Sequence, residues 1–522
     1  MKLIFERDIT EREGTMKNIK LSSFLLIISC VLGFYSQANG QQVIKAWGHN
    51  DVGQVGDGTT GNNKLLAVAV NGLPGTPIAV AGGGAHQWAT DFSLALLSDG
   101  TVWSWGNNSF GQLGDGTTVS KTTPVQVLGI TNAIAIAAGG SGSKNSSVFG
   151  MALLADGTVK TWGGNTYGQL GDGTIINRSA PVTVSGLTNV TAIACGGDFA
   201  YALLSNGTIK SWGRNNFSYS YGQGMLGDGT IINRYTPVTV YGITNATAIA
   251  ACAYYGLALL ADGTISAWGN NSKGQLGDGT KTNRLKPVKV YGITNATAIA
   301  GSYFDSGNPS SIALLADGTL RTWGSNNHGQ LGDGTTIAKV KPVQVFGITN
   351  AIAIARGGVD WHAVLLADRT VKIWGYGSYG QLGDGTIVTK YKPLTVPGVT
   401  NVQSICGGQY HCMVIVDITP LKSQGSEEKV SIRKPISLQV YPMPFNSTSE
   451  ISYYVPNQTN VKLTVYSADG RKVKTLVNAM QTSGQYNLKW NGLSDNGKNV
   501  PTGIYYLNLN AGTRINKKLI KL

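Results

Sequence analysis

The stretch Trp105-Gly-Asn-Asn-Ser-Phe-Gly-Gln-Leu-Gly-Asp-Gly-Thr117 decides the fold, because the chain carries seven variants of it. The Trp-Gly pair recurs at intervals of 50 to 58 residues, and a Gly-Asp-Gly-Thr follows each copy. A period of this length is typical of a repeat architecture. The seven tryptophans of the Trp-Gly pairs are Trp47, Trp105, Trp162, Trp212, Trp268, Trp323 and Trp374.

Each repeat has the pattern of four short strands. Thr158-Val-Lys-Thr-Trp-Gly163 alternates apolar and polar residues, which is typical of a half-buried strand. Short apolar runs follow at 181–184, 190–194 and 201–204, and no stretch has the period of an amphipathic helix. Four short antiparallel strands repeated seven times predict an all-β chain that closes radially into a seven-bladed β-propeller.

Asp-Gly and Asn-Gly pairs predict which strands share a blade. These pairs are strong hairpin signals, because both turn residues must adopt a positive φ. The strand before each such pair therefore pairs with the Trp-Gly strand after it, which places the sequence repeat out of step with the blade. The strand at 43–47 then lacks an upstream partner and the strand at 413–416 a downstream one. Pairing these two strands closes the ring and removes both open edges.

The repeat resembles that of a known family. The pattern Trp-Gly-x-Asn-x-x-Gly-Gln-Leu-Gly-x-Gly, followed by Pro-Val-x-Val, Ala-x-Gly-Gly and Ala-Leu, is similar to the regulator of chromosome condensation repeat. The resemblance implies a seven-bladed propeller over residues 41–417. Eukaryotic members of that family include nucleotide-exchange factors for a nuclear GTPase. A secreted bacterial relative uses the same propeller to bind a protein, a β-lactamase.

The first 40 residues have the pattern of a targeting segment. Lys17 and Lys20 precede an apolar run from Leu21 to Tyr35, and small residues follow near Ala38. The apolar run is too short and too interrupted for a membrane span, so we expect none in the mature protein. Residues 1–40 are therefore predicted to be a signal peptide, with residues 1–15 as an upstream extension.

A second module follows the repeats. Residues 418–436 are polar and aperiodic, as expected of a linker, and alternation resumes over 437–522 with a strand at Val461–Tyr466, which predicts a small β-sandwich. Several pieces of this module, including Tyr441-Pro-Met-Pro-Phe445 and Lys517-Lys-Leu-Ile-Lys-Leu522, resemble the C-terminal sorting domain of the type IX secretion system of Bacteroidetes. The resemblance implies export by that machinery. We therefore expect a secreted protein or one held at the outer-membrane surface.

The net charge of +14 is concentrated at the C-terminal end. Residues 418–522 hold 14 basic and 5 acidic side chains, whereas residues 41–417 hold 22 and 18. A nearly neutral repeat region argues against a nucleic-acid footprint there, so nucleic acid is not an expected partner. The cysteines that follow the signal, Cys195, Cys252, Cys406 and Cys412, are expected to be buried thiols, with a Cys406–Cys412 bridge as the alternative.

The repeats carry no recognisable catalytic or cofactor motif. The Gly-Gln-Leu-Gly-Asp-Gly-Thr loops lack the lysine of a phosphate-binding loop and open no helix. One aspartate per loop is far short of a calcium ligand set, and the five histidines are dispersed over the repeats. We predict structural turns, no metal, no cofactor and no enzymatic activity. A polysaccharide-acting enzyme and an exchange factor are the alternatives.

The variable loops predict a binding face. If the Trp-Gly strands run upward, the long loops that end in Gly-Asp-Gly-Thr and the loops after Gly-Gly share the top of the propeller. Aromatic residues gather in these top loops, and aromatics are favoured interface anchors. We therefore predict that this face engages a protein or a glycan. The candidate binding residues are Trp88, Phe217, Tyr219, Tyr221, Tyr254, Tyr255, Tyr303, Phe304, Trp361 and Tyr410.

Overall fold

The computed structural model describes residues 41–84, 90–140, 148–216, 223–302, 308–418, 437–441, 445–455, 458–511 and 514–522. The predicted signal peptide lies outside these residues, as does the linker apart from Ile418. The chain divides into two compact units, Met1–Leu421 and Lys422–Leu522. The described elements are all strands, and no described helix is long and apolar enough to cross a membrane.

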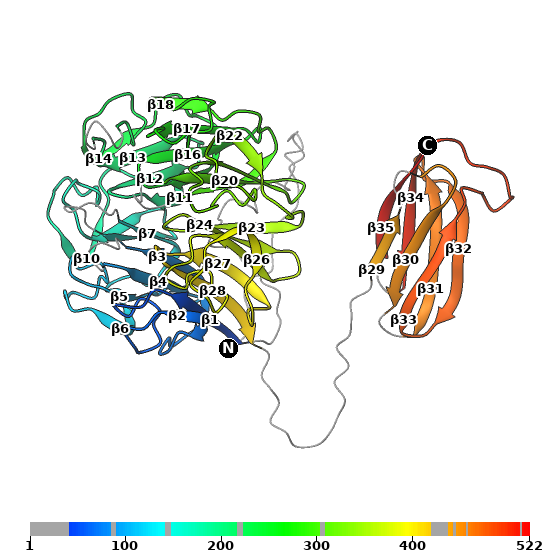
Figure 1. The fold of residues 1–522 in the computed structure, drawn as a ribbon, viewed down its shortest axis with the longest axis horizontal. Coiled ribbons are helices and arrows are strands. Elements are labelled where there is room, and N and C mark those ends of the chain that lie inside the picture. Colours follow the sequence, from blue (N-terminus) through cyan, green and yellow to red (C-terminus); the bar gives the residue numbers. More distant parts are fainter. Residues whose placement is uncertain are drawn as a thin grey trace, which may run out of the picture. The chain divides into compact units, whose positions relative to one another are not determined.

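The first unit is a propeller of seven four-stranded antiparallel sheets, as predicted (Figure 1). Blades 1 to 3 follow the chain order. Blade 1 is β3 (Pro77–Gly83), β4 (Phe92–Leu97), β5 (Val102–Gly106) and β6 (Lys121–Gln126); blade 2 is β7 (Ala133–Gly139), β8 (Phe149–Leu154), β9 (Val159–Gly163) and β10 (Arg178–Thr183); blade 3 is β11 (Val190–Cys195), β12 (Phe199–Leu204), β13 (Ile209–Gly213) and β14 (Arg234–Thr239).

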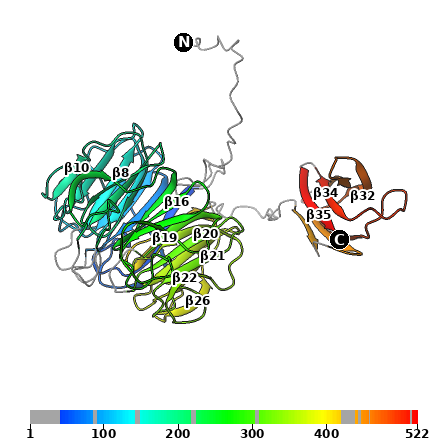
Figure 2. The ribbon, with the colours of Figure 1, turned by 90° about the horizontal axis from the view of Figure 1, so that it is seen from above.

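Blades 4 to 6 repeat this order, and Figure 2 shows β19, β20, β21 and β22 of blade 5 together. Blade 4 is β15 (Ala246–Ala251), β16 (Tyr255–Leu260), β17 (Ile265–Gly269) and β18 (Arg284–Lys289); blade 5 is β19 (Ala296–Gly301), β20 (Ser310–Leu315), β21 (Leu320–Gly324) and β22 (Lys339–Gln344); blade 6 is β23 (Ala351–Arg356), β24 (Trp361–Leu366), β25 (Val371–Gly375) and β26 (Lys390–Thr395).

Blade 7 joins the two ends of the propeller. It consists of β27 (Val402–Gly407), β28 (His411–Ile418), β1 (Gln41–Gly48) and β2 (Lys64–Ala69) in the order β2-β1-β28-β27. Val43 pairs with Val416 and Ala46 with Met413, so the predicted ring closure is confirmed. The pairing extends from Gln41↔Ile418 to Gly48↔His411, which hides the edges that both end strands would otherwise expose.

The innermost strands of blades 1 to 6 are rich in alanine, because the ring is narrowest there. Strands such as β15, with the sequence ATAIAA, contact the innermost strand of the next blade, and β27 contacts β3 to complete the circuit. Alanine and glycine let these neighbouring backbones approach closely. The wider outer part is filled by the tryptophans of the Trp-Gly strands, and each of these seven side chains is fully buried.

The second unit is a β-sandwich, as predicted. One sheet has the order β29 (Ser437–Tyr441), β30 (Ser449–Val455), β33 (Gly484–Trp490); the other has the order β32 (Lys472–Gln481), β31 (Thr459–Ser467), β34 (Gly503–Asn510), β35 (Arg514–Lys521). Residues from both sheets, among them Ile451, Leu463, Trp490 and Leu507, form one buried cluster. In the first unit, Cys195, Cys252, Cys406 and Cys412 are buried thiols outside any disulfide, so the alternative Cys406–Cys412 bridge is wrong.

Candidate functional site

The Trp-Gly tryptophans fasten neighbouring blades together. Each indole N–H donates to a backbone carbonyl of the preceding blade, as Trp374 does to Gln330 at 2.9 Å and Trp105 to Gln54 at 2.9 Å. In blade 3 the acceptor is Met225 instead of glutamine, at 3.0 Å from Trp268. The same contact recurs around the whole ring. The tryptophans therefore stabilise the joints between blades.

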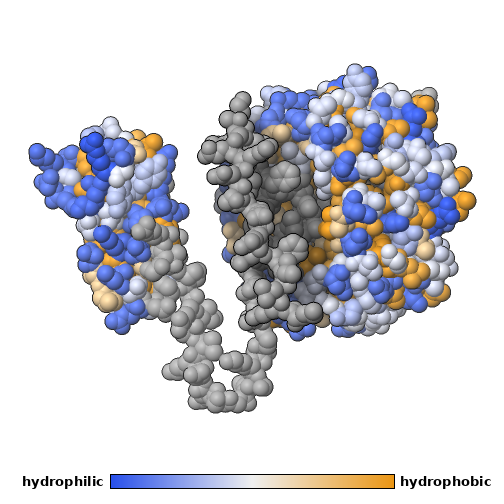
Figure 3. Space-filling view, turned by 180° about the vertical axis from the view of Figure 1, so that it is seen from behind, coloured by the Kyte–Doolittle hydropathy of each residue, from blue (hydrophilic) through white to orange (hydrophobic). Residues whose placement is uncertain are grey.

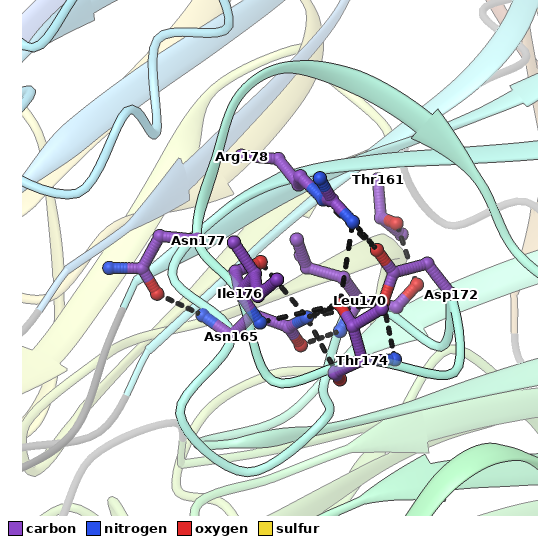
Figure 4. Close-up of polar contacts among 8 residues, drawn as sticks. All are labelled: Thr161, Asn165, Leu170, Asp172, Thr174, Ile176, Asn177 and Arg178. Carbon is purple, nitrogen blue, oxygen red and sulfur yellow. Dashed lines mark hydrogen bonds and ion pairs between the residues drawn. The ribbon is translucent and has the colours of Figure 1, made fainter.

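The Gly-Asp-Gly-Thr segments are structural turns, as Figure 4 shows for blade 2. Asp172 accepts hydrogen bonds from the backbone N–H of Thr174 at 2.9 Å and from its hydroxyl at 2.7 Å. Asn165 donates to Asp172 and to the Thr174 carbonyl, while Arg178 forms an ion pair with Asp172 at 2.9 Å. These contacts lower the pKa of Asp172 despite its partial burial, which raises that pKa. The carboxylate is therefore committed to its own loop.

The position of these turns differs from the prediction. The long loops leave the expected end of the propeller, but their Gly-Asp-Gly parts descend between two blades. Gly116 donates its N–H to the Ser179 carbonyl on β10 of the next blade, and Gly114 lies against the Trp162 indole. A Cβ at Gly114 would lie 2.8 Å from that ring, and its φ of 65° also favours glycine. These segments therefore close the joints between blades.

One face of the propeller is formed by the residues that directly follow each Trp-Gly pair and by the loops that precede the second strand of each blade. We call it the loop face. In every blade, the residue after Trp-Gly donates its N–H to the residue before the second strand, as His49 does to Tyr410 at 2.9 Å and Tyr376 to Asp360 at 2.8 Å. The shared backbone position is constant, but the side chains on it differ from blade to blade. The blades therefore differ from one another in side-chain chemistry on the loop face.

Aromatic and histidine side chains gather on the loop face where blades 5, 6, 7 and 1 meet. The ring centroids of Tyr379 and Tyr410 lie 4.4 Å apart, and Tyr376 lies 6.2 Å from each of them. His49 contacts Tyr379 at 5.3 Å, and His328 contacts Tyr376 at 4.7 Å. We call these five residues the aromatic–histidine cluster. Tyr376, Tyr379 and His328 are partly exposed, so the cluster meets solvent through them.

Each histidine of the cluster pairs with at least one carboxylate. His328 lies 2.7 Å from Asp360, and His49 lies 3.0 Å from Asp51 and 3.4 Å from Asp91. The Asp360 carboxylate raises the pKa of His328. Burial lowers the pKa of His49, but Asp91 and Asp51 outweigh burial and the net shift is upward.

Burial favours the protonated form of two tyrosines of the cluster, Tyr379 and Tyr410. Burial raises the pKa of Tyr379, and it raises that of Tyr410 well above its ordinary value. The cluster thus presents tyrosine rings flanked by two imidazole–carboxylate pairs. Such a surface offers flat apolar contact area together with hydrogen-bond donors and acceptors at fixed positions. Among the described residues, no three His, Cys, Asp or Glu side chains are placed to hold a metal ion.

The structure describes only some of the residues predicted to bind a partner. Tyr410 joins the cluster and is 6% exposed, and Tyr254 is 5% exposed. Tyr255 and Trp361 are fully buried, so their predicted exposure as surface anchors is corrected. They are the first residues of β16 and β24, the position that buries Phe92 in blade 1. Outside the described residues lie Trp88, Phe217, Tyr219, Tyr221, Tyr303 and Phe304.

Sequence reasoning missed most of the cluster. Tyr376 and Tyr379 were not among the candidates, and His49 and His328 counted only as dispersed histidines. A signal was present, because the residue after Trp-Gly is asparagine in blades 1 and 4 but His49 in blade 7 and Tyr376 in blade 6. Departures from the repeat at a constant backbone position therefore mark the site better than aromatic content does.

Comparisons with known proteins agree with this architecture. Residues 43–414 match the RCC1-like domain family, and residues 444–514 match the FlgD Ig-like domain. The chain is 28% identical over 425 residues to the E3 ubiquitin-protein ligase HERC2 of Mus musculus, covering 79% of this chain but 8% of HERC2. It is 27% identical to the ultraviolet-B receptor UVR8 of Arabidopsis thaliana, covering 70% of this chain and 68% of UVR8.

Among solved structures, Prp20p of Saccharomyces cerevisiae superimposes with a TM-score of 0.62 at 21% identity, over 75% of this chain and 94% of Prp20p. Human WBSCR16 gives a TM-score of 0.61 at 20% identity, over 72% of this chain and 99% of WBSCR16. Both likenesses support the propeller fold.

Proposed function

Because residues 43–414 make this chain a member of the RCC1-like domain family, we propose that it is a non-catalytic binding module whose loop face engages a protein. The aromatic–histidine cluster is the observation that carries the proposal. Tyrosine is enriched among residues that dominate binding energy, and a cluster surrounded by buried loops can exclude water from the contact. Rigid blades hold the cluster, as is usual for binding loops on a fixed scaffold.

Similar propellers support a protein as the partner. Prp20p has been studied for its binding to Gsp1p and histones, and it has been crystallised bound to Kap60. A glycan on the same face is the second possibility, since tyrosine rings also stack on sugars. Polysaccharide hydrolysis or elimination and guanine-nucleotide exchange are the catalytic alternatives. The carboxylates of the cluster already pair with histidines, which disfavours a free acid–base pair for the first of these.

Loss of the exposed part of the cluster should weaken binding. We expect the variant Tyr376→Ala/Tyr379→Ala/His328→Ala to bind the partner at least about tenfold more weakly, because truncated interface anchors cost about 2 kcal/mol or more. The full chain is first used to isolate a partner from cell-surface material, and the dissociation constant is then measured by calorimetry. The matched control, Tyr235→Ala/Leu66→Ala, removes exposed apolar side chains from the outer strands β14 and β2.

Equal affinity of the two variants for the partner would refute the loop-face proposal. Turnover of a polysaccharide, or accelerated nucleotide release from a GTPase, would refute the non-catalytic part of it.

We also propose that the protein is exported and acts outside the cell, with residues 437–522 addressed to the type IX secretion machinery. The β-sandwich, its match to an Ig-like domain and the signal-like segment at 1–40 support this. Mass spectrometry of culture fluid and outer membrane should find a mature chain that starts after Ala38 or Gly40 and lacks the C-terminal unit. Recovery only of an intracellular chain that retains both ends would contradict the proposal.

A further inference from the structure

A second surface, on the outer rim of blades 3 to 6, carries three aromatic–lysine pairs. In each pair a ring follows the outermost strand of one blade, and the lysine comes from the outermost strand of the next. The ammonium nitrogens lie 3.9, 4.0 and 4.3 Å from the ring centroids. We call this set the rim arc; its pairs are Tyr241 with Lys286, Tyr291 with Lys341, and Phe346 with Lys392.

The rim arc is exposed. Its three rings are 56%, 57% and 57% exposed, an unusual state for large aromatic side chains that recur on three successive blades. Each lysine stem crosses the second glycine of a Gly-Asp-Gly turn; a Cβ at Gly229 would lie 2.9 Å from the Lys286 side chain. Figure 3 shows hydrophobic and hydrophilic residues interleaved on the visible surface of the propeller. The lysine stems therefore lie across the joint between two blades, and both the aromatic rings and the ammonium groups are exposed to solvent.

The lysines and the aromatic rings of the rim arc both depart from the sevenfold repeat, and they do so at the same joints. At the position of the lysines, the other blades carry Leu66, Thr123, Ala180 and Thr236. At the position of the rings, the blades that precede them carry Pro397, Asn71, Leu128 and Ser185. Lysine therefore occurs only where the preceding blade supplies a ring. Fold maintenance alone gives no reason for this restriction, since the other joints close without it.

The lysines of the arc are not neutralised. Arg284 on the same strand as Lys286 pairs with Asp278 at 2.7 Å, and Arg234 pairs with Asp228 at 3.0 Å. None of the three arc lysines forms an ion pair with another described residue. An ammonium has three N–H donors, and stacking on a ring leaves donors free on its solvent side. Each pair thus offers a flat apolar ring beside an available positive charge.

We propose that the rim arc binds a linear acidic polysaccharide. Sugar rings present C–H faces that pack on aromatic rings, and carboxylate or sulfate groups accept hydrogen bonds from the lysines. Packed sheets lie about 10 Å apart, so lysines on successive blades are separated by at least about that distance. Duplex DNA carries one charge per about 1.7 Å, which calls for denser cations. One lysine per blade needs only one acidic group every few sugars, and a polysaccharide with a carboxylate or sulfate on each sugar also supplies it.

The strands β14, β18, β22 and β26 follow one another along the propeller edge (Figure 1). One polysaccharide chain can therefore contact all three aromatic–lysine pairs. This surface is separate from the loop face, so the two proposals fail independently.

The test measures binding of the full chain to dextran sulfate, polygalacturonate and neutral dextran of equal length at physiological salt. We expect binding to one or both acidic polymers, which separates sulfate from carboxylate recognition, and none to dextran. Lys286→Gln/Lys341→Gln/Lys392→Gln should weaken it at least tenfold, and so should Tyr241→Ala/Tyr291→Ala/Phe346→Ala, which keeps every charge. Lys160→Gln/Lys210→Gln/Lys372→Gln removes the same charge from the third strands of blades 2, 3 and 6, and should change affinity less than twofold.

The control matters because the basic C-terminal unit is present in every variant and attracts any polyanion. Equal weakening by both lysine variants would show nonspecific attraction and overturn the proposal. So would tighter, arc-dependent binding of duplex DNA, or full affinity of the aromatic variant. Unchanged melting temperatures of the variants establish that a loss of binding is not a loss of fold.

Discussion

Replacement of Trp374 by alanine is expected to lower the free energy of unfolding of the propeller by about 4 to 8 kcal/mol. Truncation of a buried tryptophan costs about 3 to 5 kcal/mol. The Gln330 carbonyl, which accepts the indole N–H at 2.9 Å, would lose this partner in a dry joint at a further cost of about 1 to 3 kcal/mol. Urea unfolding followed by tryptophan fluorescence and circular dichroism measures the change. Trp374→Phe should lie between the wild type and the alanine variant.

Trp103 provides the matched control. It lies on β5, a strand of the same type, but its side chain is only partly buried and its N–H bonds locally to the Thr101 hydroxyl at 3.1 Å. Trp103→Ala should cost less than about 1.5 kcal/mol, in the range of ordinary substitutions outside the core. If the two alanine variants lose the same stability, the tryptophans of the Trp-Gly pairs do not fasten the blades.

The fold could be predicted from the sequence because its determinants are local and repeated. The Asp-Gly hairpins define which strands pair within a blade, and the seven periods define the number of blades. Ring closure followed from the count alone, since one strand at each end lacked a partner. The descent of the Gly-Asp-Gly turns between blades could not be predicted in this way, because it depends on contacts with the next repeat, such as Gly116 with Ser179.

The candidate site was harder to predict, because the cluster is built from neighbours in space. Tyr379 of blade 6 contacts His49, which precedes it by more than three hundred residues and becomes its neighbour only when blade 7 closes. Conversely, Tyr255 resembled a loop aromatic in the sequence but begins a buried strand. Alignment of the seven repeats with one another would have assigned it to the core position of Phe92.

Ring closure gives the second large expected effect. Val414 lies in β28, between β1 and β27, where it pairs with Lys45 on one side and Ile405 on the other. Proline has no N–H and is not accommodated in the middle of a sheet. Val414→Pro should therefore break the ladder that joins the ends of the propeller and lower the free energy of unfolding by more than about 3 kcal/mol, with exposure of buried groups such as Ile44 and Met413. Melting temperature and limited proteolysis around residues 41–48 measure the effect.

A proline elsewhere in the same blade separates closure from a general intolerance of proline. Ala67 on β2 occupies the position that holds proline in each of the other six blades, as Pro181 does on β10. An outermost strand has no neighbour on one side, so a missing N–H there costs little. Ala67→Pro should change the melting temperature by no more than a degree or two. If it destabilises the chain as much as Val414→Pro does, the sensitivity belongs to blade 7 as a whole and not to the β1–β28 seam. If both are harmless, the ring does not depend on that seam, and the joints made by the tryptophans and Gly-Asp-Gly turns suffice to hold seven blades together.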